Sequence, residues 1–310
     1  MKVIITGGAG FIGSHLVERL LEENCQVTVV DNLTTGKRSN LPHNPHLNFI
    51  QKNILDCTEA DFSPPIDAIV HLAAIASVNT SWSQPLKAHR NNLSATLAAI
   101  ALCKTLSIPR LVFASSAAVY GNPIQLPIAE SHLTQPLSPY GLQKLCSEQY
   151  INLFAKQYNF SAINLRFFNV FGPRQDPNSP YSGVISIFTN RMRQGLPIAV
   201  FGDGHQTRDF IYVKDIAKAL YQALIKPISP GNSLTCNLGR GEKISLLDLV
   251  NILRKCLPQW NESIDFSPAR LGDIVHSQAD ISVAASELDF KPDWEIELAL
   301  NHFLESQTLD

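Results

Sequence analysis

Several features that the sequence lacks exclude whole classes of protein. No apolar run in the 310 residues approaches the roughly 20 that a membrane-spanning helix needs, so we expect no membrane association. The 25 basic and 27 acidic residues give a net charge of −2, and the lysines and arginines are scattered. We therefore expect no nucleic-acid partner. A β-like apolar run begins at Lys2, so we expect no signal peptide.

Signatures of metal sites and disulfides are equally scarce. The six cysteines form no CxxC pair, and the nine histidines lack the spacing of metal ligands. The cysteines are Cys25, Cys57, Cys103, Cys146, Cys236 and Cys256. Several of them lie within apolar helical or β-like patterns, as buried reduced thiols do in cytoplasmic proteins. The sequence therefore predicts no metal site and a cytoplasmic location.

Apolar β-like runs alternate with helical patterns through the first half of the chain. The runs cover 2–6, 26–30, 47–50, 67–72, 110–114 and 161–166. Long helices are predicted over 84–106 and 139–158, the second capped by Ser138 with Pro139 in its first turn. Such alternation predicts an α/β fold with a doubly wound parallel sheet covered by helices on both faces.

The composition changes after about residue 172, because 172–180 is too rich in proline and asparagine for the interior of an element. We predict a dinucleotide-binding domain over 1–172 and a smaller C-terminal α/β domain over 173–310 that binds the substrate. The segment 212–238 is typical of a helix followed by a strand, so its return to the main sheet stays open.

A glycine-rich turn joins the first predicted strand to the first helix. Gly8 permits a tight turn, Gly10 allows a pyrophosphate to approach the backbone, and Gly13 lets the helix pack closely on the sheet. The unpaired N–H groups at the helix N-terminus would hold the phosphates. Asp31 ends the next β-like run, where a carboxylate can accept hydrogen bonds from the adenosine ribose. This order of elements predicts a dinucleotide site, and an ordinary glycine-rich turn is the alternative.

Tyr140 and Lys144 are candidates for the chemistry. They are four residues apart on a predicted helix and therefore lie on the same face. A phenol with a pKa near 10 is a poor base at neutral pH, and lowering this pKa by about three units takes roughly 4 kcal/mol. Lys144 and an oxidised nicotinamide ring could supply this together through positive charge. A solvent-facing tyrosine–lysine pair is the alternative interpretation.

Two serines end the fifth β-like run, at the sheet edge where ligands bind in open α/β folds. Ser116 is the better candidate to hydrogen-bond the substrate hydroxyl that Tyr140 deprotonates. Ser115 is expected to satisfy backbone groups at the strand end, and the alternative is that both serines do only this.

These motifs make the chain resemble the extended short-chain dehydrogenase/reductases, specifically the NAD-dependent nucleotide-sugar epimerases and dehydratases. The matching segments run in order over nearly the whole chain: TGGAGFIG at 6–13, DNL at 31–33, HLAA at 71–74, SSAAVYG at 115–121, YGLQK at 140–144, RFFNVFGPRQ at 166–175, RDFIYVKD at 208–215 and RLGD at 270–273. The resemblance implies a Rossmann-type sheet, bound NAD and a UDP-sugar substrate. It also implies a homodimer that packs through the long helices 84–106 and 139–158.

The resemblance assigns NAD binding to the glycine turn, the ends of the β-like runs and the catalytic helix. The implied residues are Gly7, Gly10, Phe11, Ile12, Gly13, Asp31, Asn32, Asn53, Ile54, Leu72, Ala73, Ala74, Asn92, Tyr140 and Lys144. Asn53 stands where the family usually has aspartate, which weakens the implied contact to adenine. The carboxylate of Asp31 would repel a 2′-phosphate, so NAD is favoured over NADP.

The resemblance places the nucleotide sugar mainly against the second half of the chain. The implied substrate-binding residues are Ser77, Ser116, Asn169, Ala199, Phe201, Arg208, Arg270, Asp273 and Ser277. Arg208 and Arg270 would clamp the diphosphate, because forked guanidinium groups match phosphate oxygens. A surface ion pair is the alternative for each arginine. Leu271 stands where the family usually has proline, which removes a rigid turn but keeps the arginine.

The two residues after Ser116 distinguish the reactions of this family. The 4,6-dehydratases that the chain resembles have an Asp-Glu pair there, because eliminating water needs a further acid and base, whereas this chain has Ala117 and Ala118. We therefore predict 4-epimerisation of UDP-glucose and UDP-galactose. Ser277 aligns with a residue beside carbon 2 of the sugar, where a small side chain admits the N-acetylated pair of sugars. The alternatives are a UDP-uronate 4-epimerase, a 4-reductase and a catalytically silent NAD-binding sensor or scaffold.

Overall fold

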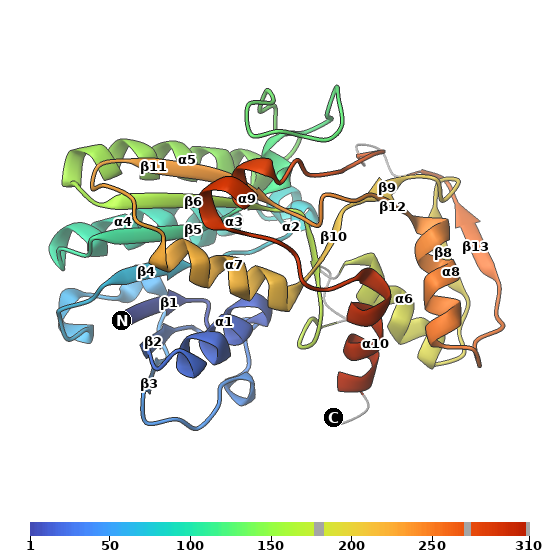
Figure 1. Ribbon diagram of the computed structural model, residues 1–310, viewed down its shortest axis with the longest axis horizontal. Helices are drawn as coiled ribbons and strands as arrows, with labels where there is room; N and C mark the ends of the chain where they lie inside the picture. The colour runs from blue at the N-terminus through green and yellow to red at the C-terminus, as the bar shows by residue number, and fades with distance from the viewer. Residues whose placement is uncertain (177–182, 270–273, 308–310) are drawn as a thin grey trace.

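The computed structural model describes residues 1–176, 183–269 and 274–307, and over these residues its main sheet has seven parallel strands (Figure 1). In spatial order they are β11 (Ser233–Leu238), β6 (Ser161–Phe167), β5 (Arg110–Ser116), β4 (Ala68–His71), β1 (Lys2–Thr6), β2 (Gln26–Val30) and β3 (Leu47–Ile50). The strand order changes direction between β1 and β4. Ligands of doubly wound sheets bind at the carboxyl ends of the strands beside this point. The predicted fold class is confirmed.

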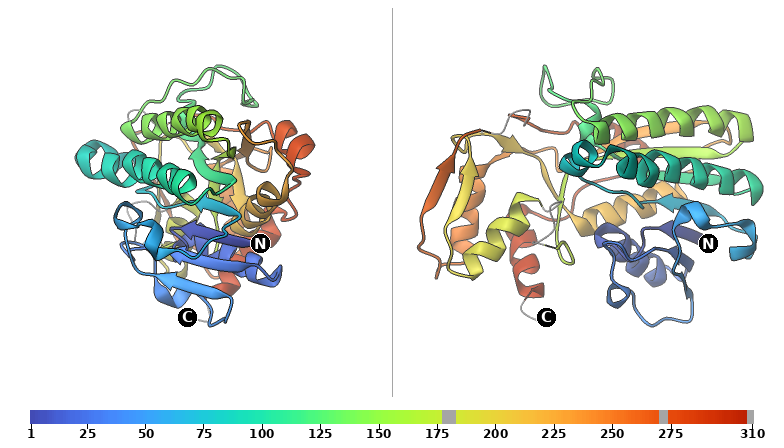
Figure 2. Two further views of the ribbon diagram at one scale, coloured as in Figure 1. Left: turned by 90° about the vertical axis from the view of Figure 1, so that its left-hand side faces the viewer. Right: turned by 180° about the vertical axis from the view of Figure 1, so that it is seen from behind.

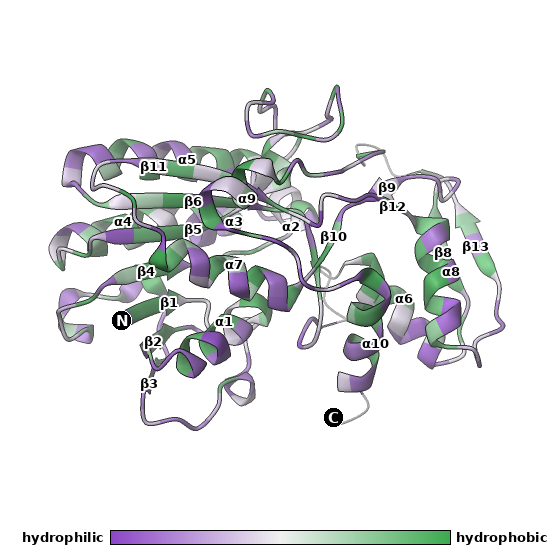
Figure 3. Cartoon of the chain, viewed as in Figure 1, coloured by the Kyte–Doolittle hydropathy of each residue, from purple (hydrophilic) through white to green (hydrophobic). Residues whose placement is uncertain are grey.

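Helices cover both faces of this sheet (Figure 2). α1 (Phe11–Glu22), α7 (Val213–Ile225) and α9 (Ser282–Leu288) pack on one face, and α4 (Ala95–Thr105) and α5 (Pro139–Tyr158) pack on the other. Every residue of β6 is buried, as expected for a parallel strand covered on both sides. Figure 3 shows hydrophobic residues along β1 and a mixture of hydrophobic and hydrophilic residues along α7. The core therefore consists of two apolar layers, one on each side of the sheet.

α5 begins and ends where the sequence predicts, and the Ser138 hydroxyl accepts the Gly141 N–H at 3.1 Å. The long helix expected over 84–106 is present from Pro85 to Thr105, but a π-helical turn that was not expected lies at its centre. The structure has α3 (Pro85–His89), a π-helical turn η4 (Arg90–Ser94) and then α4. The buried Asn92 in this turn bonds to Ile75 and Gln143, contacts that only the fold creates. Such π-helical turns are frequent at functional sites.

A smaller part of the chain lies beside the carboxyl ends of the sheet strands (Figure 1). It contains α6 (Val184–Arg193), α8 (Leu246–Cys256) and α10 (Ile296–Ser306) around a core of its own. Its strands form short pairs: β7 (Asn169–Phe171) with β10 (Phe210–Tyr212), β8 (Ile198–Phe201) with β13 (Ile264–Ser267), and β9 (Thr207–Arg208) with β12 (Ile244–Ser245). The segment 212–238 supplies α7 and β11 to the main sheet, so the chain passes between the two parts more than once.

Short turns complete the connections. They are α2 (Val78–Ser83), η1 (Arg38–Asn40), η2 (Ile54–Asp56), η3 (Glu59–Asp61) and η5 (Ala117–Val119). Of these, η5 directly follows β5 and carries the two alanines that stand after Ser116. Within the described ranges, none of the helices combines the length and apolar character needed to cross a bilayer.

Candidate active site

The glycine turn after β1 brings main chain close to main chain. Gly7 has a φ of +73°, and a Cβ there would lie 2.8 Å from the backbone that follows β4. A Cβ on Gly13 would lie 2.2 Å from the carbonyl oxygen of Gly7. α1 begins at Phe11, and its N-cap residue Gly10 offers no side-chain cap to the N–H groups of the first turn, which have no partner within the helix. This arrangement suits an anion that approaches the backbone directly.

Asp31 connects the glycine turn to the end of β2. Its carboxylate accepts the N–H of Ala9 at 3.0 Å and that of Leu33 at 2.8 Å. Burial raises the pKa of Asp31, and these two bonds oppose the shift. The exposed Asn32 beside it accepts the Thr34 N–H at 3.1 Å. Asp31 therefore holds the turn in place at the predicted position of the adenosine ribose.

The other residues expected to contact adenine and the cofactor backbone follow β3 and β4 at the same edge. Asn53 caps η2 by accepting a backbone N–H of that turn at 3.1 Å, and Ile54 is buried in the core. Leu72 and Ala73 donate their N–H groups to the end of β1, at 3.1 Å and 3.3 Å, and Ala74 follows them. The structure thus places these residues after strands of the same sheet edge, and the backbone at 72–73 lies against Gly7.

His71, the last residue of β4, is a site residue that the sequence analysis did not single out. Its Nδ1 lies 2.7 Å from the Thr6 hydroxyl, and its ring stacks on Phe113 with centroids 5.9 Å apart. Burial, assisted by the charge of Lys144, lowers the pKa of His71 to about 3, so the ring is neutral. A histidine at the end of an otherwise apolar run was the signal that could have indicated it.

Asn92 connects the loop after β4 to the catalytic helix. Its side chain accepts the Ile75 N–H at 2.8 Å and donates to the Gln143 side-chain oxygen on α5 at 2.7 Å. The Thr96 hydroxyl donates to the Asn92 carbonyl at 3.0 Å and lies 3.1 Å from the Ser147 hydroxyl. These buried bonds fix the position of α5, while a direct contact between Asn92 and NAD stays a prediction.

β5 and α5 bring Ser116, Tyr140 and Lys144 together. The Ser116 hydroxyl hydrogen-bonds Tyr140, and its oxygen also accepts the Ala118 N–H at 3.2 Å. Lys144 Nζ donates to the Ala114 carbonyl at 2.6 Å and lies 5.9 Å from the centroid of the Tyr140 ring. Lys144 is buried, which speaks against the solvent-facing interpretation of the pair. We refer to these three residues as the catalytic trio.

Burial dominates the electrostatics of the catalytic trio. It raises the pKa of Tyr140, and the hydrogen bond with Ser116 opposes this shift. Burial also lowers the pKa of Lys144 to about 8, against the attraction of Glu148. The protein by itself therefore does not acidify the phenol. Positive charge bound beside Tyr140 would act against this effect of burial and favour the phenolate.

Three of the predicted substrate residues converge at β7, β9 and the segment that starts at 274. Asn169 opens β7 and donates its N–H to the Asp209 carbonyl at 3.0 Å. Arg208 on β9 donates from NH1 to the carbonyl of the preceding residue at 2.9 Å and to that of Val275 at 3.3 Å. Ser277 is buried and donates its N–H to β9 at 3.2 Å. The diphosphate and sugar residues that the resemblance implies are thus adjacent in space.

Asp209 holds these segments together, and the sequence analysis did not single it out. Its buried carboxylate accepts the N–H groups of Arg240 at 2.6 Å, Gly241 at 3.0 Å and Ala279 at 2.9 Å. Burial raises the pKa of Asp209 to about 6, and the three bonds oppose the shift. An acid between Arg208 and an apolar strand was the available signal.

The remaining predicted substrate residues are more dispersed. Ala199 and Phe201 lie on β8 in the smaller part, Ala199 with its side chain exposed. Ser77 is buried and caps α2 through its hydroxyl oxygen. Arg270 and Asp273 lie outside the described residues.

Comparison with known proteins identifies the family. A profile of the NAD dependent epimerase/dehydratase family matches residues 3–239. The chain belongs to this family. A UDP-N-acetylglucosamine 4-epimerase from Methanobrevibacter ruminantium M1, solved with UDP-N-acetylmuramic acid, is 38% identical with a TM-score of 0.94, and the match covers 99% of this chain and 98% of that one.

Two further solved structures agree with this assignment. UDP-glucose 4-epimerase from Thermotoga maritima, solved with UDP-glucose, is 34% identical with a TM-score of 0.94 over 100% of both chains. MoeE5, solved with UDP-glucuronic acid and NAD, is 32% identical with a TM-score of 0.90 over 100% of this chain and 99% of that one. All three relatives are similar to this chain along essentially its whole length.

NAD is the cofactor of the epimerase/dehydratase family, and the residues at the sheet edge fit it. The uncapped start of α1 suits a pyrophosphate, and the close main-chain packing at Gly7 and Gly13 holds the turn and the helix in position for it. The Asp31 carboxylate can accept ribose hydroxyl protons and disfavours a 2′-phosphate. The catalytic trio lies at the ends of neighbouring elements of the same edge. The predicted cofactor is confirmed.

Proposed function

We propose that this member of the epimerase/dehydratase family is an isomerase that interconverts UDP-glucose and UDP-galactose at carbon 4. The observation that carries the proposal is the catalytic trio, which brings Ser116, Tyr140 and the buried Lys144 together at the carboxyl end of β5. The relatives solved with UDP-sugars support the nucleotide and the sugar class. The catalytically silent alternative is disfavoured, because Ser116, Tyr140 and Lys144 are all present and adjacent.

The residues act on the proton of the sugar hydroxyl. Bound NAD supplies the hydride acceptor and a positive charge. Tyr140, as phenolate, takes the proton of the hydroxyl on carbon 4, and Ser116 positions that oxygen by a hydrogen bond. Lys144 stabilises the phenolate through its ammonium charge. Tyr140 returns the proton when carbon 4 is reduced, so the trio ends each cycle in its starting state.

Inversion requires the sugar to present its other face while the nucleotide stays bound. Arg208 holds the diphosphate in this proposal, and Arg270 would do so from outside the described residues. The buried Asp209 keeps β9 and the segment with Ser277 together during this rotation. The rotation therefore takes place about the diphosphate link, between the trio and the smaller part.

The structure places Ala117 and Ala118 in η5, directly after Ser116. Neither side chain can donate or accept a proton, so the position lacks the extra acid and base that eliminating water needs. This favours simple 4-epimerisation over dehydration.

The substituent that the site accepts on carbon 2 of the sugar, a hydroxyl or an N-acetyl group, depends in this proposal on Ser277. Ser277 is buried beside β9, and its small side chain is compatible with an N-acetyl group. We expect Ser277→Tyr to abolish activity on the N-acetylated UDP-hexoses while activity on UDP-galactose stays within about threefold. Product formation from both substrates checks this, and equal loss on both would contradict the proposed role.

A panel of nucleotide sugars tests the function. We expect the NAD-bound protein to convert UDP-galactose to UDP-glucose, identified by NMR, with no net consumption of NAD. A substrate deuterated at carbon 4 should keep its deuterium there, because the hydride returns to the same carbon. Turnover of UDP-glucuronic acid alone would favour the uronate alternative. Stoichiometric consumption of reduced nicotinamide would favour a reductase, and stoichiometric consumption of NAD would contradict epimerisation.

We further propose a homodimer through the helical stretch 84–106, which begins with α3, and through α5. Large apolar side chains on these helices are exposed: Leu86 (86%), Leu142 (52%) and Leu153 (67%). Exposed apolar residues gathered on neighbouring helices are typical of an interface. Sedimentation equilibrium should give twice the chain mass, and a monomer at micromolar concentration would contradict the proposal.

A cytoplasmic location is consistent with the state of the cysteines. All six are free thiols, and Cys25, Cys103 and Cys236 are buried in the sheet layers. Free buried thiols fit a reducing compartment. Six reactive thiols per denatured chain, isolated without reductant, would support this, and fewer would contradict it.

A further inference from the structure

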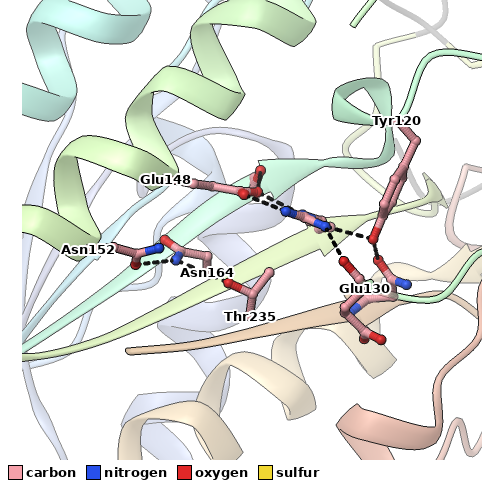
Figure 4. A network of polar contacts seen from close by, with 9 residues as sticks. Tyr120, Glu130, Glu148, Asn152, Asn164 and Thr235 are labelled. Carbon is pink, nitrogen blue, oxygen red and sulfur yellow. Dashed lines mark hydrogen bonds and ion pairs between the residues drawn. The ribbon is translucent and has the colours of Figure 1, made fainter. Parts of the chain in front are cut away.

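A buried ion pair joins Glu148 on α5 to Arg166 on β6, and Figure 4 shows the polar contacts around Glu148. Glu148 is one helical turn beyond Lys144 on α5 and is 3% exposed. Arg166 on β6 donates Nε to one carboxylate oxygen at 2.9 Å and NH2 to the other at 2.7 Å. Ser115 on β5 donates its hydroxyl to the same carboxylate. Three separate elements thus converge on one carboxylate.

The guanidinium of Arg166 also makes hydrogen bonds on the side that faces away from Glu148. Its NH1 donates to the Tyr120 hydroxyl at 2.9 Å and to the Glu130 carbonyl at 3.3 Å. The Tyr120 hydroxyl in turn donates to the Asn237 side-chain oxygen at 2.6 Å. The guanidinium of Arg166 is therefore bonded on both sides, and these bonds hold it against the carboxylate of Glu148.

The groups that face Lys144 come from several elements. Tyr140 and Glu148 lie on its own helix, His71 faces it from β4, and Arg166 lies behind Glu148 on β6. His71 is neutral, because burial lowers its pKa to about 3. Tyr140 is neutral until it gives up its proton. Among these groups, Glu148 supplies the negative charge that opposes the desolvation of Lys144.

We infer that Glu148 is a positioning residue for the reaction: it holds a fixed negative charge behind Lys144 that keeps the ammonium protonated, and Arg166 and Ser115 hold Glu148 in place. The inference rests on the proposed function, in which the charge of Lys144 is needed. Ser115 directly precedes Ser116, so the same carboxylate also fixes the end of β5. The alternative is that Glu148 and Arg166 are only a structural cross-link.

The pKa of Lys144 lies close enough to neutral pH that a small further decrease would neutralise part of its ammonium group. Burial lowers its pKa to about 8 even with Glu148 in place. Removing the carboxylate of Glu148 would lower this pKa further. The positive charge of Arg166, no longer balanced by Glu148, would also lower it. Removing Arg166 would instead leave the attraction of Glu148 unopposed and raise the pKa of Lys144. The two substitutions therefore have opposite expected signs.

The experiment measures Lys144 in the NAD-bound, full-length protein without substrate. Titration of the ¹³Cε-lysine NMR signal, assigned with Lys144→Arg, gives the midpoint. We expect Glu148→Gln to lower this midpoint by about one pH unit and Arg166→Gln to raise it by about half a unit. The basic limb of kcat should shift with it, so the kcat ratio of Glu148→Gln to wild type should fall about fivefold from pH 7 to pH 9, with KM within about twofold.

Controls separate positioning from cross-linking. Glu130→Gln changes a carboxylate elsewhere in the network, bonded to the Asn237 N–H, and should leave the midpoint unchanged. Glu148→Asp keeps the charge and should keep the wild-type midpoint, so it and Arg166→Gln decide the matter if Glu148→Gln does not fold. An unchanged midpoint in Arg166→Gln and in any folded Glu148→Gln, with activity lost equally at every pH, would overturn the inference. Because the titration needs no substrate, failure of the proposed function would be seen separately.

Discussion

The main sheet and the smaller part prepare their ligand sites by different means. On the sheet side the site is made of main chain, where Gly7 and Gly13 leave no room for a side chain and α1 begins uncapped. On the other side a single carboxylate assembles the site, because Asp209 ties two loops to the strand that carries Arg208. Variants of the two parts should therefore fail separately: NAD binding and kcat on one side, nucleotide-sugar affinity on the other.

Tyr140→Phe should have the largest effect, a loss of about 10³-fold in kcat, because a general base contributes about 10²–10⁴-fold. Affinity for NAD and for UDP should stay within about threefold of wild type. Steady-state kinetics and calorimetric titration check both statements. Tyr150→Phe changes an exposed tyrosine on the same helix and serves as the control. Near-normal turnover of Tyr140→Phe would break the account of the sheet side.

Gly13→Ala should weaken NAD binding by about 100-fold, or about 3 kcal/mol. The added Cβ would lie 2.2 Å from a carbonyl oxygen of the glycine turn, so the backbone has to shift. UDP affinity should change by less than about threefold. Gly183→Ala is the matched control, since the nearest atom to its Cβ is 3.6 Å away. Unchanged NAD affinity in Gly13→Ala would show that the main-chain site tolerates movement.

Arg208→Met should raise KM for the nucleotide sugar by about 30-fold, since a guanidinium bond to phosphate is worth roughly 2 kcal/mol. kcat and NAD affinity should change by less than about fivefold. Arg254→Met removes an arginine that stacks on Trp260 in the same part of the molecule, and it should leave KM unchanged. A loss confined to kcat in Arg208→Met would contradict a role in anchoring the diphosphate.

Asp209→Asn should have the smallest effect, about a tenfold loss in UDP affinity. An amide offers one acceptor oxygen where the carboxylate accepts three N–H groups, so the two tied loops loosen. Asp215 is the matched control: burial also raises its pKa to about 6, and it accepts backbone N–H groups at 293 and 294. Asp215→Asn should leave UDP affinity unchanged, and equal losses in both variants would remove the special role of Asp209.

The pH dependence of stability sharpens the same test. The pKa of Asp209 is raised to about 6 in the folded protein from 3.8, so the folded state binds more protons between these values. The contribution of Asp209 to the free energy of unfolding therefore falls by about 3 kcal/mol as pH rises from about 4 to 6. In urea unfolding, the free-energy difference between wild type and Asp209→Asn should change with pH over this window. A constant difference would contradict the raised pKa.

The sequence predicts the sheet side well because its signals are local. The β-like runs 2–6, 26–30 and 47–50 coincide with β1, β2 and β3, and 139–158 coincides with α5. The glycine turn depends on residues close together in the chain. The π-helical turn η4 inside the helix expected over 84–106 could not be predicted, because Asn92 is bonded to Ile75 and Gln143, and the latter is distant in sequence.

The residues that sequence analysis missed act through partners far along the chain. Glu148 meets Ser115 and Arg166, and Asp209 meets backbone groups near 240 and 279. No spacing rule connects such positions, since only the finished fold brings them together. Buried acids among apolar residues were the sole hint, and that pattern does not name the partner.

The central claim is that Tyr140 becomes a base only when positive charge is bound beside it. Titration of the ¹³Cζ-tyrosine NMR signal of Tyr140 tests this directly, with and without oxidised NAD. We expect a midpoint above 10 in the cofactor-free protein, where burial raises the pKa, and a midpoint below about 8 when NAD is bound. A midpoint above 10 in both states would contradict the account.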